Sequence, residues 1–265
     1  MFTNTQLLFR YFNFLLRASN PKGHGIHSPF VFDFLTKVLQ DNTSFREYAV
    51  WNRWRQSLLS NHDLLTVNEI GAGSRAGSFS TRTVSSLTKI AAKTPRTAKF
   101  FFRIARYYNP STILELGTSL GLSTGFFSLA CPTSSIYTIE GVDAIADRAK
   151  RHFAEWNCEN VVVEQGNLDT CLQGLLNTIP SPDLVFMDGN HRQDATLRYF
   201  TQLLPYLSAT SMIIVDDIHW STGMEKAWSV IKTHDRVRLT IDFFQFGVVL
   251  FNPSFLGKSH FSIRY

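Results

Sequence analysis

The stretch TILELGTSLGLST, residues 112–124, decides the fold of this chain. It opens with short apolar and β-branched positions around one glutamate, the pattern of a strand buried on both faces of a parallel sheet. Gly117 and Gly121 then mark a turn, where a missing Cβ lets the backbone come close to a ligand. Ser123 and Thr124 open a helix whose free N–H groups face the same crevice. The stretch therefore predicts a strand, a glycine turn and a helix around a bound small molecule.

The spacing of the glycines in this turn narrows the choice of ligand. The pattern E-x-G-x-x-x-G departs from the dinucleotide fingerprint G-x-G-x-x-G and suits a ligand without a pyrophosphate, such as S-adenosylmethionine. A nucleoside site also needs a second strand that ends in an acid about 20 residues beyond the loop, and Glu140 ends SIYTIE at that distance. We expect the turn to hold the methionine portion, Glu140 the ribose hydroxyls, and Asn167 or its backbone the adenine. The predicted cosubstrate residues are Glu115, Gly117, Thr118, Ser119, Gly121, Ser123, Glu140, Gly141, Asn167 and Asp188.

A second glycine loop, TVNEIGAGSRAG at residues 66–77, competes with the first. It also places a carboxylate, Glu69, before glycines that include Gly71. After it, however, no acid appears until Glu115, so the ribose partner is missing. We therefore predict a loop over the pocket, in which Arg75 is one candidate for a substrate contact.

Downstream of residue 94 the periodicity alternates between short apolar runs and amphipathic helices, as in a doubly wound α/β sheet. The predicted fold is a mostly parallel, seven-stranded, Rossmann-like sheet with a C-terminal antiparallel hairpin in RVRLTIDFFQFGVVLF and an N-terminal helical extension. The expected parallel strands are 112–117, 135–140, 160–165, 183–188 and 211–217. The expected helices are 94–108, 122–130, 143–156, 169–177, 191–206 and 223–234.

The first 93 residues are expected to form a helical extension and substrate lid, ahead of a domain over residues 94–265. Three helices are predicted, at 5–17, 29–40 and 44–59. The first has apolar residues at helical spacing, which fits packing on the domain or on a second subunit; a membrane-surface helix is the alternative. The loop after it carries His24 and His27, which lack a nearby acid or cysteine to complete a metal set and suggest a structural or lid role.

Three carboxylates lie at the ends of the fourth and fifth expected strands, in VFMDGNH and IIVDDIHW. Asp188, Asp216 and Asp217 would meet at one edge of the sheet, and oxygen ligands of this kind suit Mg²⁺ or another divalent cation better than zinc. The alternative is that one aspartate contacts the cosubstrate while the others cap helices. His191 could accept a proton from a hydroxyl substrate, with His219 as the rival base.

Composition describes an ordinary globular chain, with 44% hydrophobic and 18% charged residues. Its three cysteines form neither a disulfide framework nor a zinc pattern, so a reducing, cytoplasmic setting is expected. The N-terminal apolar run is interrupted by arginines and too short to span a bilayer, which argues against export. Charge is uneven: residues 1–110 carry 15 Lys and Arg against 5 Asp and Glu, and no acid lies between Glu69 and Glu115. Such a basic segment could bind RNA, a lipid surface or an acidic substrate, or form a solvated face.

These motifs together resemble class I S-adenosylmethionine-dependent methyltransferases, specifically the metal-dependent O-methyltransferases of the catechol and caffeoyl-CoA type. The resemblance covers about Thr94 to Phe251, through ILELGTSLGLST, YTIEG, VEQGNLD, DLVFMDGNH and IIVDDIHW. It implies that Asp188, Asp216 and Asp217 bind the metal. The chain departs from the family pattern at three places. Asp217 lies where the family has Asn, and His191 where it tends to have a Lys base. Away from the crevice, Ser208-Ala209-Thr210 replaces the glycine pair usual before the fifth strand.

Three hypotheses of function follow. The leading one is O-methylation of a small hydroxylated molecule, with or without the help of a metal. The second is methylation of RNA such as tRNA through the basic segment. The third is a non-catalytic S-adenosylmethionine-binding protein, and a homodimer is a further expectation.

Overall fold

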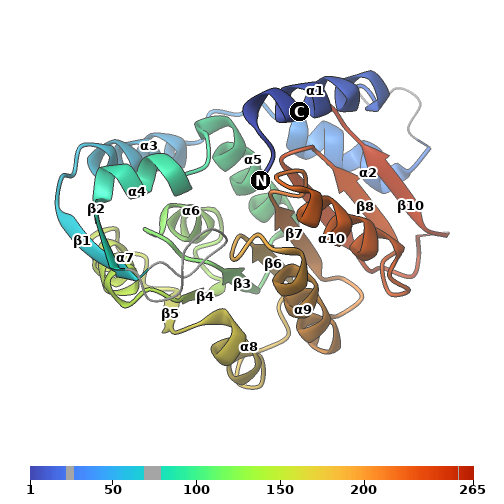
Figure 1. The fold of residues 1–265 in the computed structure, drawn as a ribbon. Coiled ribbons are helices and arrows are strands. Elements are labelled where there is room, and N and C mark those ends of the chain that lie inside the picture. Colours follow the sequence, from blue (N-terminus) through green and yellow to red (C-terminus); the bar gives the residue numbers. More distant parts are fainter. Residues whose placement is uncertain (22–26, 69–78, 256) are drawn as a thin grey trace. The chain divides into compact units, whose positions relative to one another are not determined.

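The computed structural model describes residues 1–21, 27–68, 79–255 and 257–265. Within these residues the chain forms two compact units, one made of Met1–Asp41 with Ser181–Tyr265 and the other of Asn42–Pro180. Eight of the described strands make up the main sheet, and two more form a separate antiparallel pair (Figure 1). The mixed α/β class expected from the sequence is confirmed.

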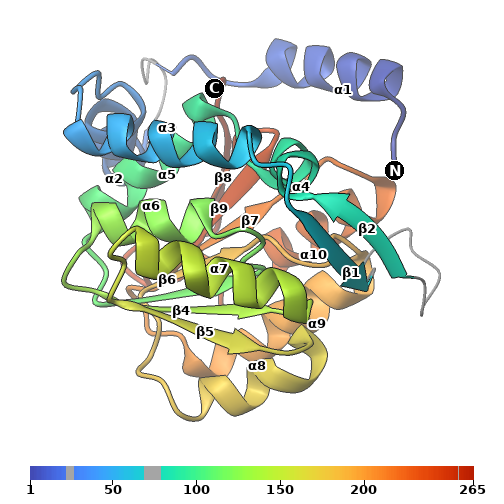
Figure 2. The same ribbon diagram turned by 90° about the vertical axis from the view of Figure 1, so that its left-hand side faces the viewer.

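The unit of residues 42–180 contains three parallel strands in the order β3-β4-β5. Every residue of β3 is buried, whereas β5 at the sheet edge is half-buried or exposed. Figure 2 shows α7 and α8 on opposite faces of these strands. The strands are β3 (Thr112–Leu116), β4 (Ser135–Glu140) and β5 (Val161–Gln165), with β1 (Leu64–Asn68) and β2 (Phe79–Thr83) as the separate pair. The helices are α3 (Arg46–Leu59), α4 (Val84–Ala91), α5 (Pro95–Tyr108), α6 (Leu122–Ala130), α7 (Asp143–Glu155) and α8 (Leu168–Leu176).

Helix α5, which leads into β3, shows how local sequence sets the element bounds. The Thr94 hydroxyl accepts the N–H of Thr97, and Pro95 occupies the first turn, where its missing N–H costs nothing. Asn109 ends the helix in the left-handed region at φ 48°. Between these caps the three phenylalanines of the sequence KFFF are buried.

The other unit joins residues 1–41 to the C-terminal part of the chain. Strand β6 (Leu184–Met187) runs parallel to β7 (Met212–Asp216), and β9 (Phe246–Leu250) is antiparallel to both β7 and β8 (Leu239–Asp242). Strand β10 (Ser259–Ser262) lies parallel to β8. Its helices are α1 (Asn4–Arg17), α2 (Pro29–Phe34), a π-helix at Leu35–Leu39, α9 (Gln193–Leu203), a 3₁₀ turn at Leu204–Tyr206 and α10 (Thr222–Thr233).

Most of the expected elements are confirmed. The strands and helices predicted between residues 112 and 234 agree with the structure within two residues at each end, except that α9 ends at Leu203 and continues to Tyr206 as a 3₁₀ turn. The C-terminal hairpin is present as β8 and β9. The sheet has eight strands rather than seven, because the short polar segment SHFS adds β10 beside β8. The helix expected at 29–40 changes to π geometry after Phe34. The competing glycine loop is flanked by β1 and β2, which pair with each other and not with the main sheet.

Candidate functional site

The glycine turn after β3 is built from residues with unusual backbone conformations. Gly117 has φ 103°, Ser119 φ 49° and Gly121 φ 84°. The N–H of Gly117 donates to the carbonyl of Ile139 on β4, which fixes the start of the turn against the neighbouring strand. At Gly121 a Cβ atom would lie 2.6 Å from the Phe153 ring, so neither the backbone angle nor the space admits a side chain. The turn thus needs glycine where the sequence places it.

Glu115 lies inside the unit, beneath this turn. Its Oε2 accepts hydrogen bonds from the hydroxyls of Thr124, in the first turn of α6, and Thr138, at 2.7 Å on β4. The Thr138 hydroxyl also lies 2.7 Å from that of Thr118. Burial raises the pKa of Glu115 to about 7, against the opposing effect of the two threonine bonds. Its Oε1 has no hydrogen-bond partner within the part of the chain that the structure describes. Glu115 therefore ties β3, β4 and α6 together below the turn.

Glu140, the acid at the end of β4, is bonded directly to the glycine turn. Its Oε2 accepts the N–H of Ser119 at 2.8 Å, and its Oε1 accepts the N–H of Val142 at 3.0 Å. Burial raises the pKa of this carboxyl, while the backbone bonds, including one from Gly141, act in the opposite direction. The turn and the acid that the spacing assigned to one nucleoside site are thus in contact.

Two further predicted residues belong to the same compact unit as these groups. Asn167 follows β5, where the N–H of Gly166 donates to the carbonyl of Glu140 at 2.8 Å. The Asn167 side chain accepts the N–H of Asp169 and caps α8. Ser123 lies half-buried in the first turn of α6.

The predicted acid cluster lies in the other unit, where β6 and β7 end. Ligand atoms of Asp188, His191 and Asp216 all lie within 4.8 Å of one another, and Asp216 is buried. The Nε2 atom of His191 is 3.7 Å from Asp188 Oδ1 and 3.7 Å from Asp217 Oδ2. Asp217 has a left-handed backbone at φ 55°, which turns the chain directly after β7. These oxygen and imidazole groups form a set that could hold a divalent cation.

His219 lies outside this cluster and belongs to a separate polar network. Its Nδ1 is 3.1 Å from Glu225 Oε1 and its Nε2 is 2.9 Å from Asp242 Oδ2, and its ring stacks on Phe244. Burial opposes the charged imidazolium, but the two carboxylates prevail and raise the pKa of His219 above its usual range. Arg10 of α1 contacts both Glu225 oxygens, at 2.6 and 2.7 Å. Sequence reasoning did not find Glu225, Asp242 or Arg10, because nothing local to them signals a partner far along the chain.

Several residues of the predicted loops lie outside the part of the chain that the structure describes. His24, Glu69, Gly71 and Arg75 lie outside the described residues, and His27 is exposed. The role predicted for these loops stays a prediction.

The basic segment is partly engaged by aromatic rings of its own unit. Lys99 Nζ lies 4.9 Å from the centre of the Tyr48 ring, and Arg106 lies 5.0 Å from that of Phe45. These cation–π contacts occupy part of the positive charge within the unit.

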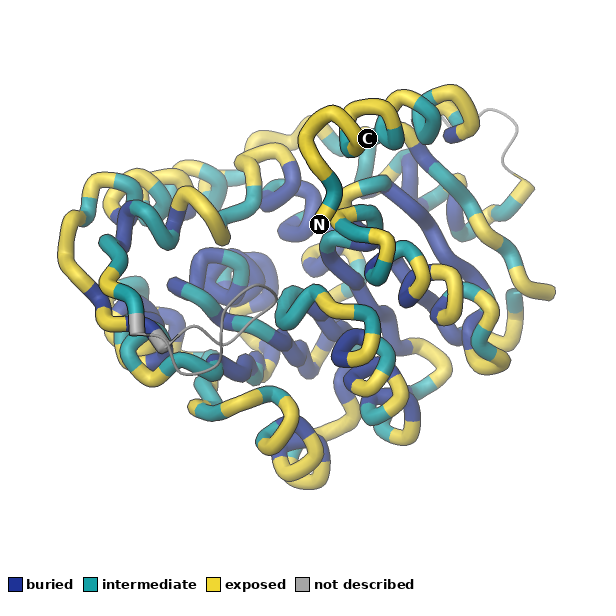
Figure 3. Tube along the Cα trace, in the orientation of Figure 1, coloured by how far each residue is buried: buried dark blue, intermediate teal, exposed yellow. Residues whose placement is uncertain are grey.

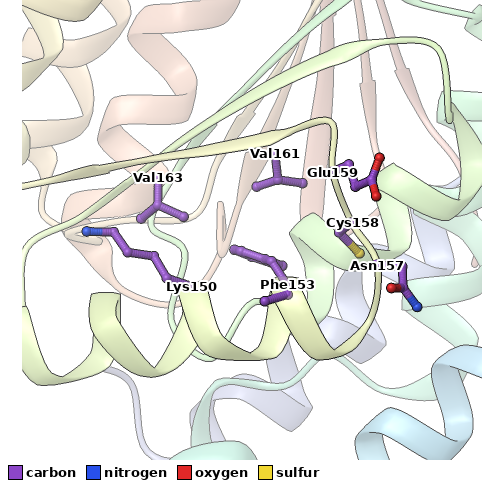
Figure 4. A pocket seen from close by; sticks show the side chains of 8 residues that line it. Lys150, Phe153, Asn157, Cys158, Glu159, Val161 and Val163 are labelled. Atoms are coloured by element: carbon purple, nitrogen blue, oxygen red, sulfur yellow. The ribbon is translucent and has the colours of Figure 1, made fainter.

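A cleft of about 480 Å³ lies beside α7 and β5 (Figure 4). Phe153, Val161 and Val163 line it together with Lys150, Ala154, Asn157, Cys158 and Glu159. None of the predicted site residues lines this cleft.

Comparison with known proteins identifies the central part of the chain. Residues 114–218, which include the glycine turn, Glu140 and the acid cluster, match a family model described as a methyltransferase domain. This chain carries a methyltransferase domain. The match begins within β3 and ends two residues after β7. The same family model therefore covers both groups of predicted site residues, the glycine turn with Glu140 and the acid cluster.

Solved structures share the fold of this methyltransferase domain. The O-methyltransferase TomG from Streptomyces achromogenes, in complex with S-adenosylmethionine, is 22% identical over 61% of this chain and 82% of its own, with a TM-score of 0.54. An O-methyltransferase from Bacillus cereus, in complex with S-adenosylhomocysteine, is 18% identical over 82% and 96%, with a TM-score of 0.56. A protein from Staphylococcus aureus described as a putative caffeoyl-CoA O-methyltransferase is 17% identical over 83% and 98%, with a TM-score of 0.55. The chain thus has the fold of class I methyltransferases. Among the described residues, no helix combines the length and apolar character that crossing a bilayer requires.

Proposed function

We propose that this methyltransferase binds S-adenosylmethionine and transfers its methyl group to a hydroxyl oxygen of a small molecule. The observation that carries the proposal is the hydrogen bond between Ser119 N–H and Glu140, which joins the glycine turn to the acid of the next strand. Two proteins of the same fold contain S-adenosylmethionine or its product S-adenosylhomocysteine. The spacing of the motifs and the contact between them support the same cosubstrate here.

Each cosubstrate residue has a role that its surroundings support. The Glu140 carboxylate would accept hydrogen bonds from both ribose hydroxyls, the role that an acid at the end of the second strand has in a nucleoside site. The glycine turn would hold the methionine portion at the start of α6. Asn167, which caps α8, would lie against the adenine. Glu115 would keep the turn in shape from below.

The acid cluster would be the acceptor site. Asp188 and Asp216, whose ligand atoms lie within 4.8 Å of each other, would hold a divalent cation together with Asp217, which follows Asp216 in the chain. Their carboxylate oxygens fit the preference of Mg²⁺ or Mn²⁺ for hard ligands. When bound, such a cation lowers the pKa of a hydroxyl oxygen and makes it a better nucleophile. An S. aureus protein of this fold described as a putative caffeoyl-CoA O-methyltransferase supports an oxygen acceptor.

His191 would act as the base. Its Nε2 lies 3.7 Å from carboxylate oxygens of Asp188 and Asp217, beyond hydrogen-bonding distance, which leaves the imidazole able to turn toward a substrate. In the reaction the acceptor O–H proton passes to His191 Nε2 while the oxygen attacks the methyl carbon. The O–CH₃ bond forms, the S–CH₃ bond breaks, and S-adenosylhomocysteine leaves with the electron pair on sulfur.

The test is a turnover assay with labelled S-adenosylmethionine, Mg²⁺ or Mn²⁺ and a panel of catechols, phenols and aliphatic alcohols, combined with calorimetry. We expect Glu140→Ala to lose cosubstrate affinity, and Asp188→Ala to lose turnover by 100-fold or more, on the order of a lost positioning group, with affinity nearly intact. Asp194→Asn, an exposed acid of the same unit, is the matched control for Asp188. Cosubstrate binding without S-adenosylhomocysteine formation from any acceptor would favour a non-catalytic binding protein. Unchanged cosubstrate affinity in Glu140→Ala would remove the ribose assignment.

A further inference from the structure

Helix α1 has two apolar faces, and only one of them is covered. Its inner face packs through Tyr11 and Phe14, whose ring centres lie 5.0 and 5.4 Å from that of Phe244. None of its fourteen residues is buried, however. Four of its exposed side chains are large and apolar: Leu8 at 69%, Phe9 at 67%, Phe12 at 58% and Leu16 at 66%.

These four side chains form one stripe, which we call the outer face of α1. A helix turns by about 100° per residue, so positions 8, 12 and 16 follow one another along the axis and position 9 lies beside them. The four fall within an arc of roughly 100°, and none of them is charged. Figure 3 shows exposed residues along this helix. An uncharged stripe of this size on a surface helix marks an interaction site.

The helix that carries this face is fastened at both ends. At its start the N–H of Phe2 donates to the carbonyl of Trp220 at 3.2 Å, and at its end the N–H of Ser19 donates to the carbonyl of Ser262 at 2.8 Å. Between them Arg10 bonds to Glu225. The outer face is therefore held in a fixed orientation, and a partner need not supply the free energy to order it.

We propose that the outer face of α1 is the interface with a second copy of this chain, which packs across a two-fold axis with the two α1 helices antiparallel. In that arrangement position 12 of each copy lies on the axis, and position 8 of one copy faces position 16 of the other. A row with four-residue spacing is complementary to itself when reversed, as a two-fold interface requires.

Charge and area favour a second copy over a lipid surface. A membrane-surface helix needs a basic polar face, but Arg10 is engaged by Glu225 and by the Phe2 ring, which leaves Arg17 as the other basic side chain of α1. Four side chains that are about two thirds exposed bury roughly 1,000 Å² in a symmetric pair, near the lower bound for a specific interface. The dimer is therefore expected to be weak and to depend on concentration.

Sedimentation of the full chain between 1 and 200 µM tests the proposal. We expect a shift from monomer to dimer over this range, and Phe12→Glu should abolish it because two like charges would meet at the axis. Val230→Glu, which places the same charge on an exposed apolar position of α10 in the same unit, is the matched control and should dimerise like the wild type. Circular dichroism and thermal unfolding of Phe12→Glu confirm that the variant is folded.

The antiparallel register of the two α1 helices is tested by introducing a complementary pair of charges. Leu8→Glu alone should weaken the dimer, and Leu8→Glu combined with Leu16→Lys should restore it, because the new carboxylate and ammonium then face each other across the axis. A monomer at all concentrations would overturn the proposal, as would a dimer that survives Phe12→Glu. Recruitment of the wild type, but not of Phe12→Glu, to vesicles of phosphatidylcholine and phosphatidylserine in place of self-association would assign the outer face to lipid instead.

Discussion

Gly121 is the residue at which backbone conformation and packing both exclude a side chain. Its φ of 84° is costly for an L residue, and an added Cβ would lie 2.6 Å from the Phe153 ring. We expect Gly121→Ala to lower the free energy of unfolding by about 2 kcal/mol or more, from backbone strain and overpacking together. Chemical denaturation measures this loss. Gly174→Ala is the matched control, because nothing lies within 4 Å of its added Cβ, and the helix propensity of alanine should leave α8 as stable or more stable.

Glu115 should make stability depend on pH. Its pKa is about 7 in the folded chain, against the ordinary value of 4.5 for a glutamate. Between these two pH values the folded state therefore keeps a proton that the unfolded state has released. Stability contributed by this group therefore falls as pH rises from about 4.5 to 7 and is constant above, with a total change of about 3 kcal/mol.

The variant Glu115→Gln isolates this effect, because its amide oxygen can still accept the hydroxyls of Thr124 and Thr138. The free energy of unfolding, measured by urea titration at several pH values, should increase for the variant relative to the wild type as pH rises from 4.5 to 7. Glu159→Gln removes a carboxylate from the surface of the same unit and serves as the control. A difference between Glu115→Gln and the wild type that does not change with pH would contradict the assignment.

At the scale of elements, α1 is attached to the C-terminal half of the chain through Arg10. Removal of this side chain in Arg10→Ala leaves Glu225 with His219 alone and takes away the ion pair that holds the middle of the helix. Because Arg10 is partly exposed, the loss should be modest, about 1 kcal/mol, which raises the local opening of α1 about fivefold. Hydrogen exchange of the α1 amides measures it. Arg17→Ala on the same helix is the control, and equal exchange in the two variants would count against the role of the ion pair.

The elements themselves show what the sequence determines. Strands such as β3 and β7 are mostly apolar, because they are buried on both faces, and this composition allows them to be predicted from the sequence. β10 is short, polar and half-buried, and its pairing with β8 depends on residues distant in sequence, so no local pattern marks it. The same holds for the site: Glu140 was found by its spacing from Gly121, whereas the Arg10–Glu225 pair spans 215 positions and has no spacing rule.

On the scale of the whole molecule, the two groups of predicted site residues fall in different compact units. The glycine turn, Glu140 and Asn167 belong to residues 42–180, whereas the acid cluster belongs to the unit that contains both chain termini. A ligand that binds only the folded chain stabilises it by an amount set by its concentration relative to its dissociation constant, about 2.7 kcal/mol at a hundredfold excess. Each ligand therefore reports on its own group through the stability of the chain.

Thermal unfolding with and without the two ligands gives the last prediction. S-adenosylmethionine and Mn²⁺, each at about 100 times its dissociation constant, should each raise Tm by roughly 5–10 °C for a chain of this size. In Glu140→Ala, S-adenosylmethionine should no longer raise Tm, while Mn²⁺ still does. In Asp188→Ala, Mn²⁺ should no longer raise Tm, while S-adenosylmethionine still does. Chelation should remove the Mn²⁺ shift from the wild type and leave the cosubstrate shift. If Asp188→Ala keeps its full response to Mn²⁺, Asp188 does not bind the cation, and the cation site proposed at the ends of β6 and β7 is wrong.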